Sequence, residues 1–444
     1  MAWKSAGLGA KPQPAGISWR RLGSYRLSVL VAIGVVCAAA AVPAGALGAG
    51  SEGLAEVQAD FSHELALAGA GSSAYVYDLT AKATLVSARA GALRRPASVE
   101  KLYTATTALD LLGPEARLQT SVLGAGTLLP DGTWEGSLYL RGGGDPTFGS
   151  SSFTHSHYGG AGASVGALAT QIALAGIRRI SGSIYGDESL FDSLRGEPSS
   201  GYAPDPFLEG SLSALSFDRG ISGSLRGAHA QAAYAARRLL ASLRADGVSV
   251  GGGAGAATTP AGALELARVQ SPPLSQLLAL TLPPSDNFFA EMLLKDLGAR
   301  IAHTGTTAAG ARVVRTALAA LVRIHPRIVD GSGLSNSDRT STYEIVQLLV
   351  ALAPTPIGAV LRDDLAVAGR TGTLERRMRH SAAAGRCRAK TGTLTGASNL
   401  TGYCTSANGH LLAFAFFNDA ISVAFAHTIQ DHLAITLARA SLEA

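Results

Sequence analysis

Three short motifs in this 444-residue chain carry hydroxyl, amine and amide side chains at spacings that suit acyl transfer. A serine hydroxyl is a weak nucleophile until a neighbouring base accepts its proton. The motifs therefore predict a serine hydrolase that passes through a covalent acyl-enzyme. In chain order they are Ser98-Val99-Glu100-Lys101, Ser285-Asp286-Asn287 and Lys390-Thr391-Gly392.

The first motif pairs a nucleophile with a base. Residues three apart on a helix share one face, so Ser98 and Lys101 can lie within hydrogen-bonding distance. A lysine amine acts as a base when burial and neighbouring cations lower its pKa. The start of a helix also presents backbone N–H groups, and the amide of Ser98 can help to bind an oxyanion. We predict Ser98 as the nucleophile and Lys101 as its base.

The other two motifs suit proton relay and substrate binding. Ser285 can relay a proton to the leaving amine, and Asn287 can hydrogen-bond a substrate amide. Lys390 offers a fixed cation for a substrate carboxylate, and Thr391 adds a hydroxyl. Gly392 leaves room for an extended substrate to pair with the edge of a sheet.

Each motif alone is a weak signal, because a lone Ser-Asp-Asn is usually a helix cap and a lone Lys-Thr-Gly a turn or strand end. The segment 370–374 nearly copies 390–394, but it lacks the lysine and is predicted as a loop. His155 and His157 are interpreted as solvated residues of a Ser/Gly-rich loop. The chain has no H-E-x-x-H or P-loop motif, so we predict neither metal nor cofactor.

The elements that must position these motifs come from both ends of the chain. Apolar periodicity predicts helices over 53–69, 97–112, 273–282, 288–302, 309–323, 341–353 and 420–441. Alternation predicts strands over 73–78, 83–87, 386–394, 399–405 and 410–418. This order predicts an α/β catalytic domain, an antiparallel sheet flanked by helices, formed by residues 47–115 and 266–444.

Residues 116–265 have a different pattern from the rest of the chain, with short strands separated by Gly/Ser-rich turns. This pattern predicts a large β-rich inserted domain. Gly/Ser-rich turns, including 150–162, separate the short elements. These are strands over 119–123, 136–141 and 182–185 and a helix over 228–243.

Composition excludes a disordered chain, because 47% of residues are apolar and only 16% are charged. The net charge of +5 alone would suggest an acidic partner such as nucleic acid. Residues 1–46, however, hold five cations and no acid, and the remaining residues carry 32 charges of each sign. We therefore predict no nucleic-acid partner.

The N-terminus resembles an export signal. A cationic segment ends at Arg26, residues 27–42 are apolar, and small residues follow Pro43. This pattern predicts a signal peptide over 1–46 and an exported protein of the periplasm or cell wall. The alternative is an uncleaved anchor, because the apolar run extended to Gly50 approaches the ~20 residues that span a bilayer. Membrane contact is expected only through this segment.

The ordered motifs resemble those of the class C low-molecular-mass penicillin-binding proteins, the D-alanyl-D-alanine carboxypeptidase/endopeptidases. The long stretch between Ser98 and Ser285 is similar to that family's insertion, and a class A β-lactamase is too short to hold it. Further similar segments are 140–148, 186–192, 330–341 and 388–403. The resemblance implies a transpeptidase/β-lactamase-like catalytic domain. Asp286 departs from the family, because many members carry Asn there.

The resemblance also implies a reaction. Ser98 would attack the peptide carbonyl before the terminal D-alanine of a peptidoglycan stem peptide, with Lys101 as base. D-Alanine would leave, water would deacylate the enzyme, and β-lactams would acylate the same serine. Some relatives cleave crosslinks between stem peptides, so endopeptidase activity is a further expectation.

Two other residues match positions that the family uses near the substrate side chain. Arg339 matches an arginine beside that side chain, and Asp205 lies where inserted residues recognise its far end. The alternatives are a structural salt bridge for Arg339 and a turn for Asp205.

Outside the export signal the chain has two cysteines, Cys387 and Cys404. If Thr395 and Gly396 form the turn between two late strands, the cysteines face each other on neighbouring strands. In an exported protein this predicts a disulfide, with free core thiols as the alternative.

Three rival functions remain open on the sequence. A β-lactamase or an esterase could use the same Ser/Lys chemistry. A catalytically idle peptidoglycan-binding protein is the third, and intact Ser98, Lys101, Asn287 and Lys390 argue against it.

Overall fold

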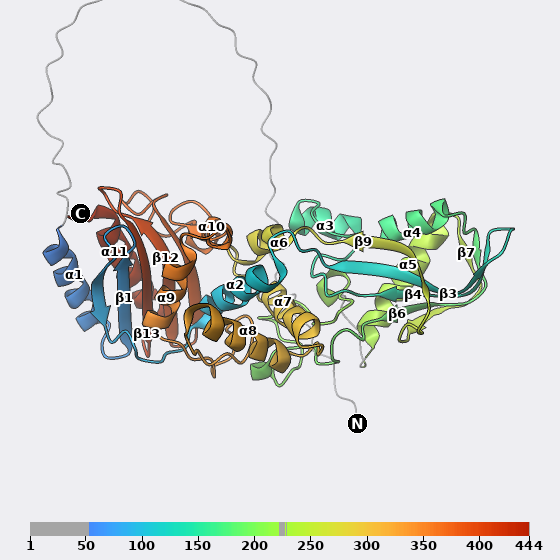
Figure 1. The fold of residues 1–444 in the computed structure, drawn as a ribbon, viewed down its shortest axis with the longest axis horizontal. Helices are drawn as coiled ribbons and strands as arrows, with labels where there is room; N and C mark the ends of the chain where they lie inside the picture. The colour runs from blue at the N-terminus through green and yellow to red at the C-terminus, as the bar shows by residue number, and fades with distance from the viewer. Residues whose placement is uncertain (1–52, 222–226, 228, 444) are drawn as a thin grey trace, which may run out of the picture. The chain divides into compact units, whose positions relative to one another are not determined.

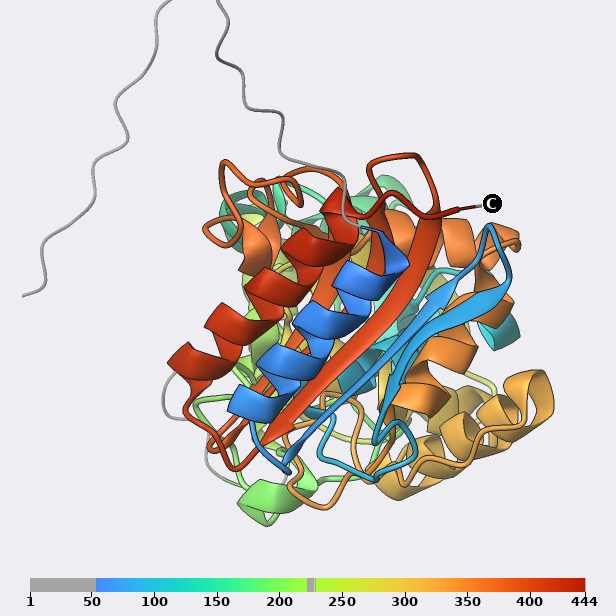
Figure 2. The same ribbon diagram turned by 90° about the vertical axis from the view of Figure 1, so that its left-hand side faces the viewer.

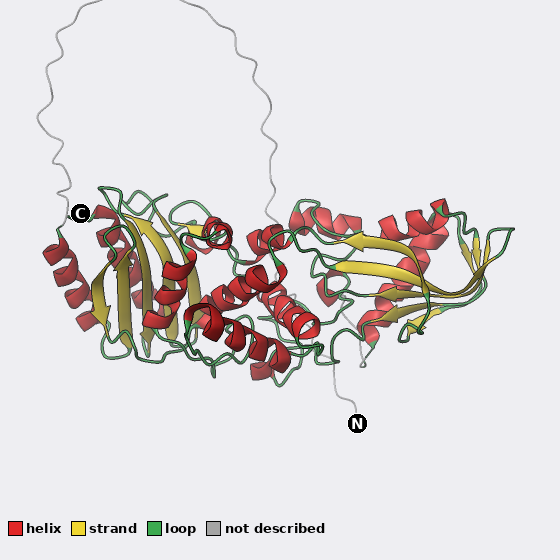
Figure 3. Cartoon of the chain, viewed as in Figure 1, coloured by secondary structure: helices red, strands yellow, loops and turns green. Residues whose placement is uncertain are grey.

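The computed structural model describes residues 53–221, 227 and 229–443. The predicted signal peptide, 1–46, lies outside these residues. Within them the strands form two sheets, one of six strands and one of seven (Figures 1 and 3).

The six-stranded sheet is antiparallel throughout, in the order β10-β11-β12-β13-β1-β2. The early strands β1 and β2 therefore lie beside the late strands, as the sequence predicts. The bounds are β1 (Ser72–Asp78), β2 (Ala83–Ala88), β10 (Ala366–Val367), β11 (Cys387–Leu394), β12 (Ala397–Thr405) and β13 (Leu411–Asp419).

Alternate side chains of this sheet enter two different hydrophobic cores, because successive residues of a strand face opposite sides. Phe416 packs into the core under α1 (Leu54–Leu67) and α11 (Val423–Arg439). These two helices lie side by side across one face of the sheet (Figure 2). Phe417 packs into the opposite core, which includes α9 (Thr342–Leu352).

The remaining helices of this part follow the predicted order. The nucleophile motif begins in a short 3-10 helix, η1 (Ala97–Glu100), which continues into α2. The helix α10 is missing from the sequence prediction, because it is short and begins at a proline. The bounds are α2 (Lys101–Leu112), α6 (Leu274–Thr281), α7 (Asn287–Ile301), α8 (Thr307–Val322) and α10 (Pro356–Asp363).

Among the described residues, no single helix is long and apolar enough to cross a bilayer. The pair α9 and α10 passes on length and composition only when taken together, and it bends by 119° at its break.

The second sheet is built from residues 119–270. Its long strands β3, β4 and β9 are antiparallel, while β5 and β6 pair with β4 in parallel. Helices α4 (Val165–Leu174) and α5 (Ala230–Ala245) pack against it around a separate core. The strands are β3 (Gln119–Leu128), β4 (Thr133–Arg141), β5 (Arg179–Ile180), β6 (Ile184–Asp187), β7 (Ser249–Val250), β8 (Ala254–Ala256) and β9 (Leu264–Gln270).

The predicted turn over 150–162 is wrong in part, because residues 151–158 form α3 (Ser151–Tyr158). The side chain of Ser150 accepts a hydrogen bond from the Phe153 amide and so caps this helix. His155 and His157 are solvent-exposed as expected, but they lie on a helix and not in a loop. The helix α4 is likewise absent from the prediction.

Candidate active site

The structure brings the three predicted motifs together from distant parts of the chain. Ser98 lies in η1 and Lys101 begins α2, while the turn Ser285–Asn287 leads into α7. The Lys390–Gly392 motif lies on β11, which packs against η1. The site therefore lies where one end of the six-stranded sheet meets the starts of two helices.

Lys101 is the centre of the hydrogen-bond network. Its Nζ donates to Ser98 Oγ at 2.9 Å, to Asn287 Oδ1 at 2.6 Å and to the Ser332 carbonyl at 2.8 Å. An ammonium group has three donors, so these contacts use all of them. The residue is only 1% exposed, and it must release one proton before it can act as a base.

Burial lowers the pKa of the Lys101 amine and so favours the neutral form that a base requires. Desolvation disfavours the charged amine, and it lowers the pKa of Lys101 to about 8. The nearby carboxyl groups, that of Asp330 most strongly, oppose this effect and keep the pKa of Lys101 from falling further. The result is an amine that is partly neutral near physiological pH, as a general base requires.

Lys390 forms a second pair with Ser285. Its Nζ donates to Ser285 Oγ at 2.7 Å and to the Thr391 carbonyl at 3.0 Å. The side chain is buried, and desolvation followed by the charge of Lys101 lowers the pKa of Lys390 well below its usual value. The charge of Lys101 therefore disfavours the charged form of Lys390.

Gly392 is required by close packing against the nucleophile. A Cβ at this position would lie 2.5 Å from the Pro96 carbonyl oxygen and 3.3 Å from the Ser98 nitrogen. Opposite Gly392 in the sheet, Asn399 donates its side-chain amide to the same Pro96 carbonyl at 2.7 Å. β11 and η1 therefore pack together with no space for a side chain at position 392. This packing is a second reason for a glycine here, besides the room for substrate pairing that the sequence predicted.

In the part of the chain that the structure describes, the edge of β11 opposite β12 has no pairing strand at the Lys390–Gly392 motif. The strand β10 pairs only with Arg388 and Ala389. From Lys390 onward, the described part of the sheet contacts β11 on the β12 side alone. An extended peptide can therefore add to this edge, as the interpretation of Gly392 assumed.

The segment 370–374 borders the site although it is not a motif itself. It contains a 3-10 helix, η4 (Gly372–Leu374), and no long strand. Thr391 Oγ1 donates to Thr373 Oγ1 at 2.8 Å, and the Thr373 amide donates to the Pro283 carbonyl at 3.0 Å. It thus supports both the Lys390 strand and the approach to Ser285.

Two residues at the site have backbones in the left-handed region. Ala97, immediately before the nucleophile, has φ of 47°, and Ser285 has φ of 68°. Non-glycine residues in this region carry strain and persist where the surroundings enforce them. Here the strain accompanies the placement of the Ser98 and Ser285 hydroxyl groups.

Glu291 is a supporting residue that the sequence analysis did not identify. Its Oε1 accepts hydrogen bonds from the amides of Gly331 and Ser332, at 2.9 and 2.8 Å. Burial and the charge of Asp330 raise the pKa of Glu291 to about 8. The signal was a carboxylate one turn after Asn287 in a largely apolar helix.

Arg339 and Asp205 make contacts within their own loops. Arg339 donates to the main-chain carbonyls of Asn336 and Asp338, so its contacts are not the salt bridge of the alternative interpretation. Asp205 Oδ1 accepts from the Phe207 amide at 2.6 Å, which makes a turn. Their contacts with a substrate stay predictions.

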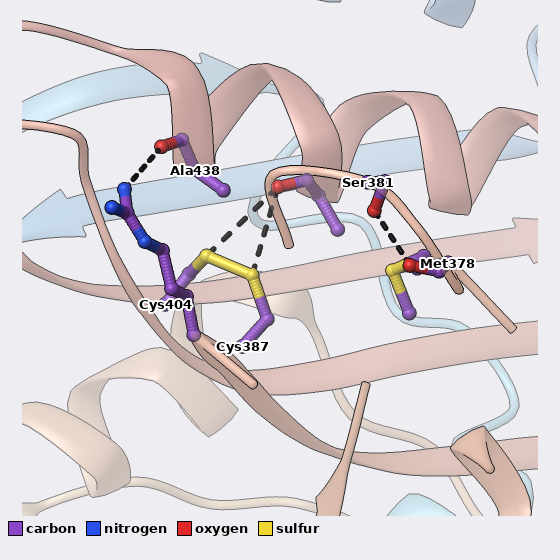
Figure 4. Close-up of a disulfide and its surroundings, with 7 residues drawn as sticks. Met378, Ser381, Cys387, Cys404 and Ala438 are labelled. Carbon is purple, nitrogen blue, oxygen red and sulfur yellow. Dashed lines mark hydrogen bonds between the residues drawn. A yellow bond between two sulfur atoms is a disulfide. The ribbon is translucent and has the colours of Figure 1, made fainter. Parts of the chain in front are cut away.

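The cysteines form the predicted disulfide. Cys387 and Cys404 are directly opposed in the β11–β12 register, and their sulfur atoms are bonded. Figure 4 shows the bridge beneath α11. The Ala434 carbonyl oxygen lies 3.6 Å from Cys387 Sγ and 3.9 Å from Cys404 Sγ. The turn at Thr395 and Gly396 is also confirmed, because Leu394 pairs with Ala397.

This arrangement can perform acyl transfer. A half-buried serine contacts a buried lysine of lowered pKa, and a second Ser–Lys pair lies at an open strand edge. The fold and site together define a serine hydrolase of the penicillin-interacting class.

Comparison with known proteins identifies the family. Residues 54–205 and 207–440 match the D-Ala-D-Ala carboxypeptidase 3 (S13) family, and the chain belongs to it. The chain is 30% identical to a D-alanyl-D-alanine carboxypeptidase from an Actinomadura species, over 94% of this chain and 91% of the relative. It is 31% identical to a carboxypeptidase from Mycobacterium tuberculosis, over 73% of this chain and 71% of that protein.

A solved structure confirms the fold class. Penicillin binding protein 4 from Haemophilus influenzae superposes with a TM-score of 0.70 at 20% identity, covering 84% of this chain and 97% of that chain. The predicted penicillin-binding fold and the carboxypeptidase family are thus both confirmed.

Proposed function

We propose that this protein removes the terminal D-alanine from peptidoglycan stem peptides through an acyl-enzyme on Ser98. The observation that carries the proposal is the position of Lys101 Nζ, in hydrogen-bond contact with both Ser98 Oγ and Asn287 Oδ1. Membership of the S13 family supports the substrate class.

The first half of the reaction forms the acyl-enzyme. Neutral Lys101 takes the proton of Ser98 while Ser98 Oγ attacks the carbonyl carbon before the terminal D-alanine. The amide of Ser98 stabilises the oxyanion of the tetrahedral intermediate. The C–N bond then breaks, and Ser285 relays a proton to the nitrogen of the leaving D-alanine. Water hydrolyses the resulting ester and restores Ser98.

The second Ser–Lys pair binds the end of the substrate. Lys390 and Thr391 contact the terminal carboxylate, and the peptide lies along the open edge of β11. Asn287 donates its amide N–H to the substrate carbonyl on the acyl side. β-Lactams carry a carboxylate and a strained amide in a similar arrangement, so they acylate Ser98.

The organisation of the chain and its location are part of the proposal. Residues 1–46 act as the export signal, and the enzyme works outside the cytoplasmic membrane, in the periplasm or cell wall. Residues 47–115 and 266–444 form the catalytic domain, and 116–265 form the inserted domain. The paired cysteines support an oxidising location.

Incubation with labelled penicillin tests the nucleophile. Wild type and an exposed control, Ser156→Ala on α3, should be labelled equally, and Ser98→Ala should not be labelled. Equal labelling of Ser98→Ala would overturn the assignment. Rapid release of hydrolysed penicillin would favour a β-lactamase, and no labelling of wild type would favour an idle binding protein.

Product analysis then tests the substrate. A stem pentapeptide ending in D-Ala-D-Ala should lose one D-alanine in a Ser98-dependent reaction. Crosslinked dimers, supplied separately, report endopeptidase activity, because their cleavage yields two monomers and no free D-alanine.

A further inference from the structure

An arginine outside the three motifs contacts the middle residue of the second one. Arg219 belongs to a short 3-10 helix, η3 (Asp218–Gly220), in the region between the first and second motifs. Its Nη1 donates to Asp286 Oδ2 at 2.6 Å and its Nη2 to Asp286 Oδ1 at 3.1 Å. Such a two-point contact fixes both distance and orientation, and the arginine is only 7% exposed.

Asp286 is the residue between Ser285 and Asn287. Its Oδ1 also accepts a hydrogen bond from the Phe289 amide at 3.0 Å, which caps the start of α7. The guanidinium carbon of Arg219 lies 4.8 Å from the centre of the Phe288 ring. Arg219 is therefore held against the first turn of the helix that carries Asn287.

The same arginine holds a loop of its own region over the site. Its Nε donates to the Glu209 carbonyl at 2.8 Å, and its carbonyl accepts from the Ser211 amide at 2.9 Å. Two residues before Glu209, the Phe207 carbonyl accepts a hydrogen bond from Asn287 Nδ2 at 2.7 Å. Arg219 thus connects the loop 207–211 to the turn 285–287 from both sides.

The loop determines which way the Asn287 amide points. The ammonium of Lys101 only donates, so it requires the Asn287 oxygen. The Phe207 carbonyl only accepts, so it requires the Asn287 nitrogen. With both neighbours in place the amide has one orientation, and one of its two N–H groups remains for the substrate carbonyl.

We propose that Arg219 is a positioning residue for acylation: it clamps the loop 207–211 onto the turn 285–287 and thereby fixes the orientation of the Asn287 amide. The inference deepens the proposed function and rests on it. Arg219 does not touch the substrate, and its effect passes through Asn287.

The chain offers a matched control for this contact. Lys295, also on α7, is buried, and its Nζ lies 2.6 Å from Asp192 Oδ1, in the region that contains Arg219. This ion pair joins the same region to the same helix, but it lies two turns beyond Asn287. If such ion pairs only stabilised the fold, loss of the Arg219–Asp286 pair and loss of the Lys295–Asp192 pair should change the acylation rate to a similar extent.

The experiment compares Arg219→Met with Lys295→Met in the full chain. The readout is the acylation rate constant at saturating labelled penicillin, measured by stopped flow below the melting temperature of each variant. We expect a fall of about 10- to 100-fold for Arg219→Met, as for loss of one preorganised donor. We expect less than a twofold change for Lys295→Met, whatever its melting temperature.

Further variants separate positioning from folding. Arg219→Lys keeps a cation but loses the two-point contact, so it should give an intermediate rate and remains informative if Arg219→Met does not fold. Asp286→Asn retains the helix cap, and combined with Arg219→Met it should lower the rate no further than Arg219→Met alone.

Each result of these rate measurements either supports or overturns the role proposed for Arg219. Equal acylation rates for folded Arg219→Met, or folded Arg219→Lys, and Lys295→Met would overturn it. Additive losses in the double variant would also overturn it, because the two residues would then act independently. Failure of the proposed function is a different result, in which wild type itself shows no Ser98-dependent labelling.

Discussion

Asn287 and Glu291 lie one turn apart on α7, and both determine the surroundings of Lys101. Asn287 accepts a hydrogen bond from the Lys101 amine directly. Glu291 instead accepts hydrogen bonds from the amides of Gly331 and Ser332, and the Ser332 carbonyl accepts another of the three hydrogen bonds of the Lys101 amine. One helix therefore supplies one of the three hydrogen-bond partners of the Lys101 amine and holds the segment that supplies another.

This relationship predicts a difference between two substitutions of Glu291. Burial and the charge of Asp330 raise the pKa of Glu291 and so favour its neutral form. The neutral side chain of Glu291→Gln keeps the oxygen that accepts both hydrogen bonds, so this variant should fold as stably as wild type and acylate within about twofold of its rate. Glu291→Ala leaves two buried amides without partners and should cost about 2–4 kcal/mol of folding free energy. Urea unfolding and penicillin labelling measure both quantities. Equal behaviour of the two variants would contradict the assigned contacts.

The lowered pKa of Lys101 predicts the pH dependence of acylation. Only the neutral amine can accept the Ser98 proton, so the rate should rise with pH and level off above about pH 8. Between pH 6 and pH 8 the neutral fraction grows about 50-fold for a group of this pKa. Labelling rates measured from pH 5.5 to 9.5 test this. A flat profile over that range would exclude Lys101 as the titrating base.

Lys390 should take up a proton when a substrate binds. Burial and Lys101 lower its pKa in the empty site, whereas a bound carboxylate favours the charged amine and raises it. Titration calorimetry of Ser98→Ala with a D-Ala-D-Ala peptide, in buffers of different ionisation enthalpy and over a series of pH values, should show net proton uptake on binding. The same peptide with a terminal carboxamide is the control and should show none. Equal uptake by both peptides would remove Lys390 from this role.

Gly392→Ala should abolish labelling and lower stability by about 1–3 kcal/mol, as overpacking does. The added methyl group would meet the Pro96 carbonyl at 2.5 Å and push β11 away from Ser98. Gly166→Ala is the control, because nothing lies within 4 Å of its added carbon and it sits in the helix α4. That variant should be neutral or up to about 1 kcal/mol more stable. Full labelling of Gly392→Ala would disprove the close contact.

Replacing both Cys387 and Cys404 by alanine should lower stability by about 3 kcal/mol, because their separation of 17 residues closes a loop of moderate length. Thiol titration of denatured, unreduced protein provides a second measurement. A chain without residues 1–46 should show no free thiol, and a chain that retains Cys37 should show one. Two additional thiols would mean that the bridge is absent.

Much of the catalytic sheet could be predicted from the sequence because its strands alternate regularly and their turns are short. The Cys387–Cys404 register followed from a single two-residue turn. The helix starts around Ser98 and Asn287 were similarly clear, because side-chain motifs mark them. Between residues 116 and 265, α3 and α4 are short helices in Gly/Ser-rich sequence and have no strong periodicity.

The supporting contacts of the site could not be predicted in the same way. Lys101 and Asn287 are held by the carbonyls of Ser332 and Phe207, and any residue type can supply a main-chain carbonyl. The Arg219–Asp286 pair joins residues 67 positions apart across irregular loops, where spacing carries no periodic signal. Such contacts depend on the tertiary path of the chain.

The position of β1 beside β13 has a consequence for biosynthesis. Ser72 pairs with Asn418, 346 residues later, so β1 can pair early with β2 but gains its second neighbour, β13, only when the last segment of the chain has left the ribosome. A nascent or prematurely terminated chain contains Ser98 and Lys101 but has neither Lys390 nor the strand that seats it. The newly made polypeptide is therefore inert until translation is complete, and hydrolytic activity arises only in the finished, folded chain.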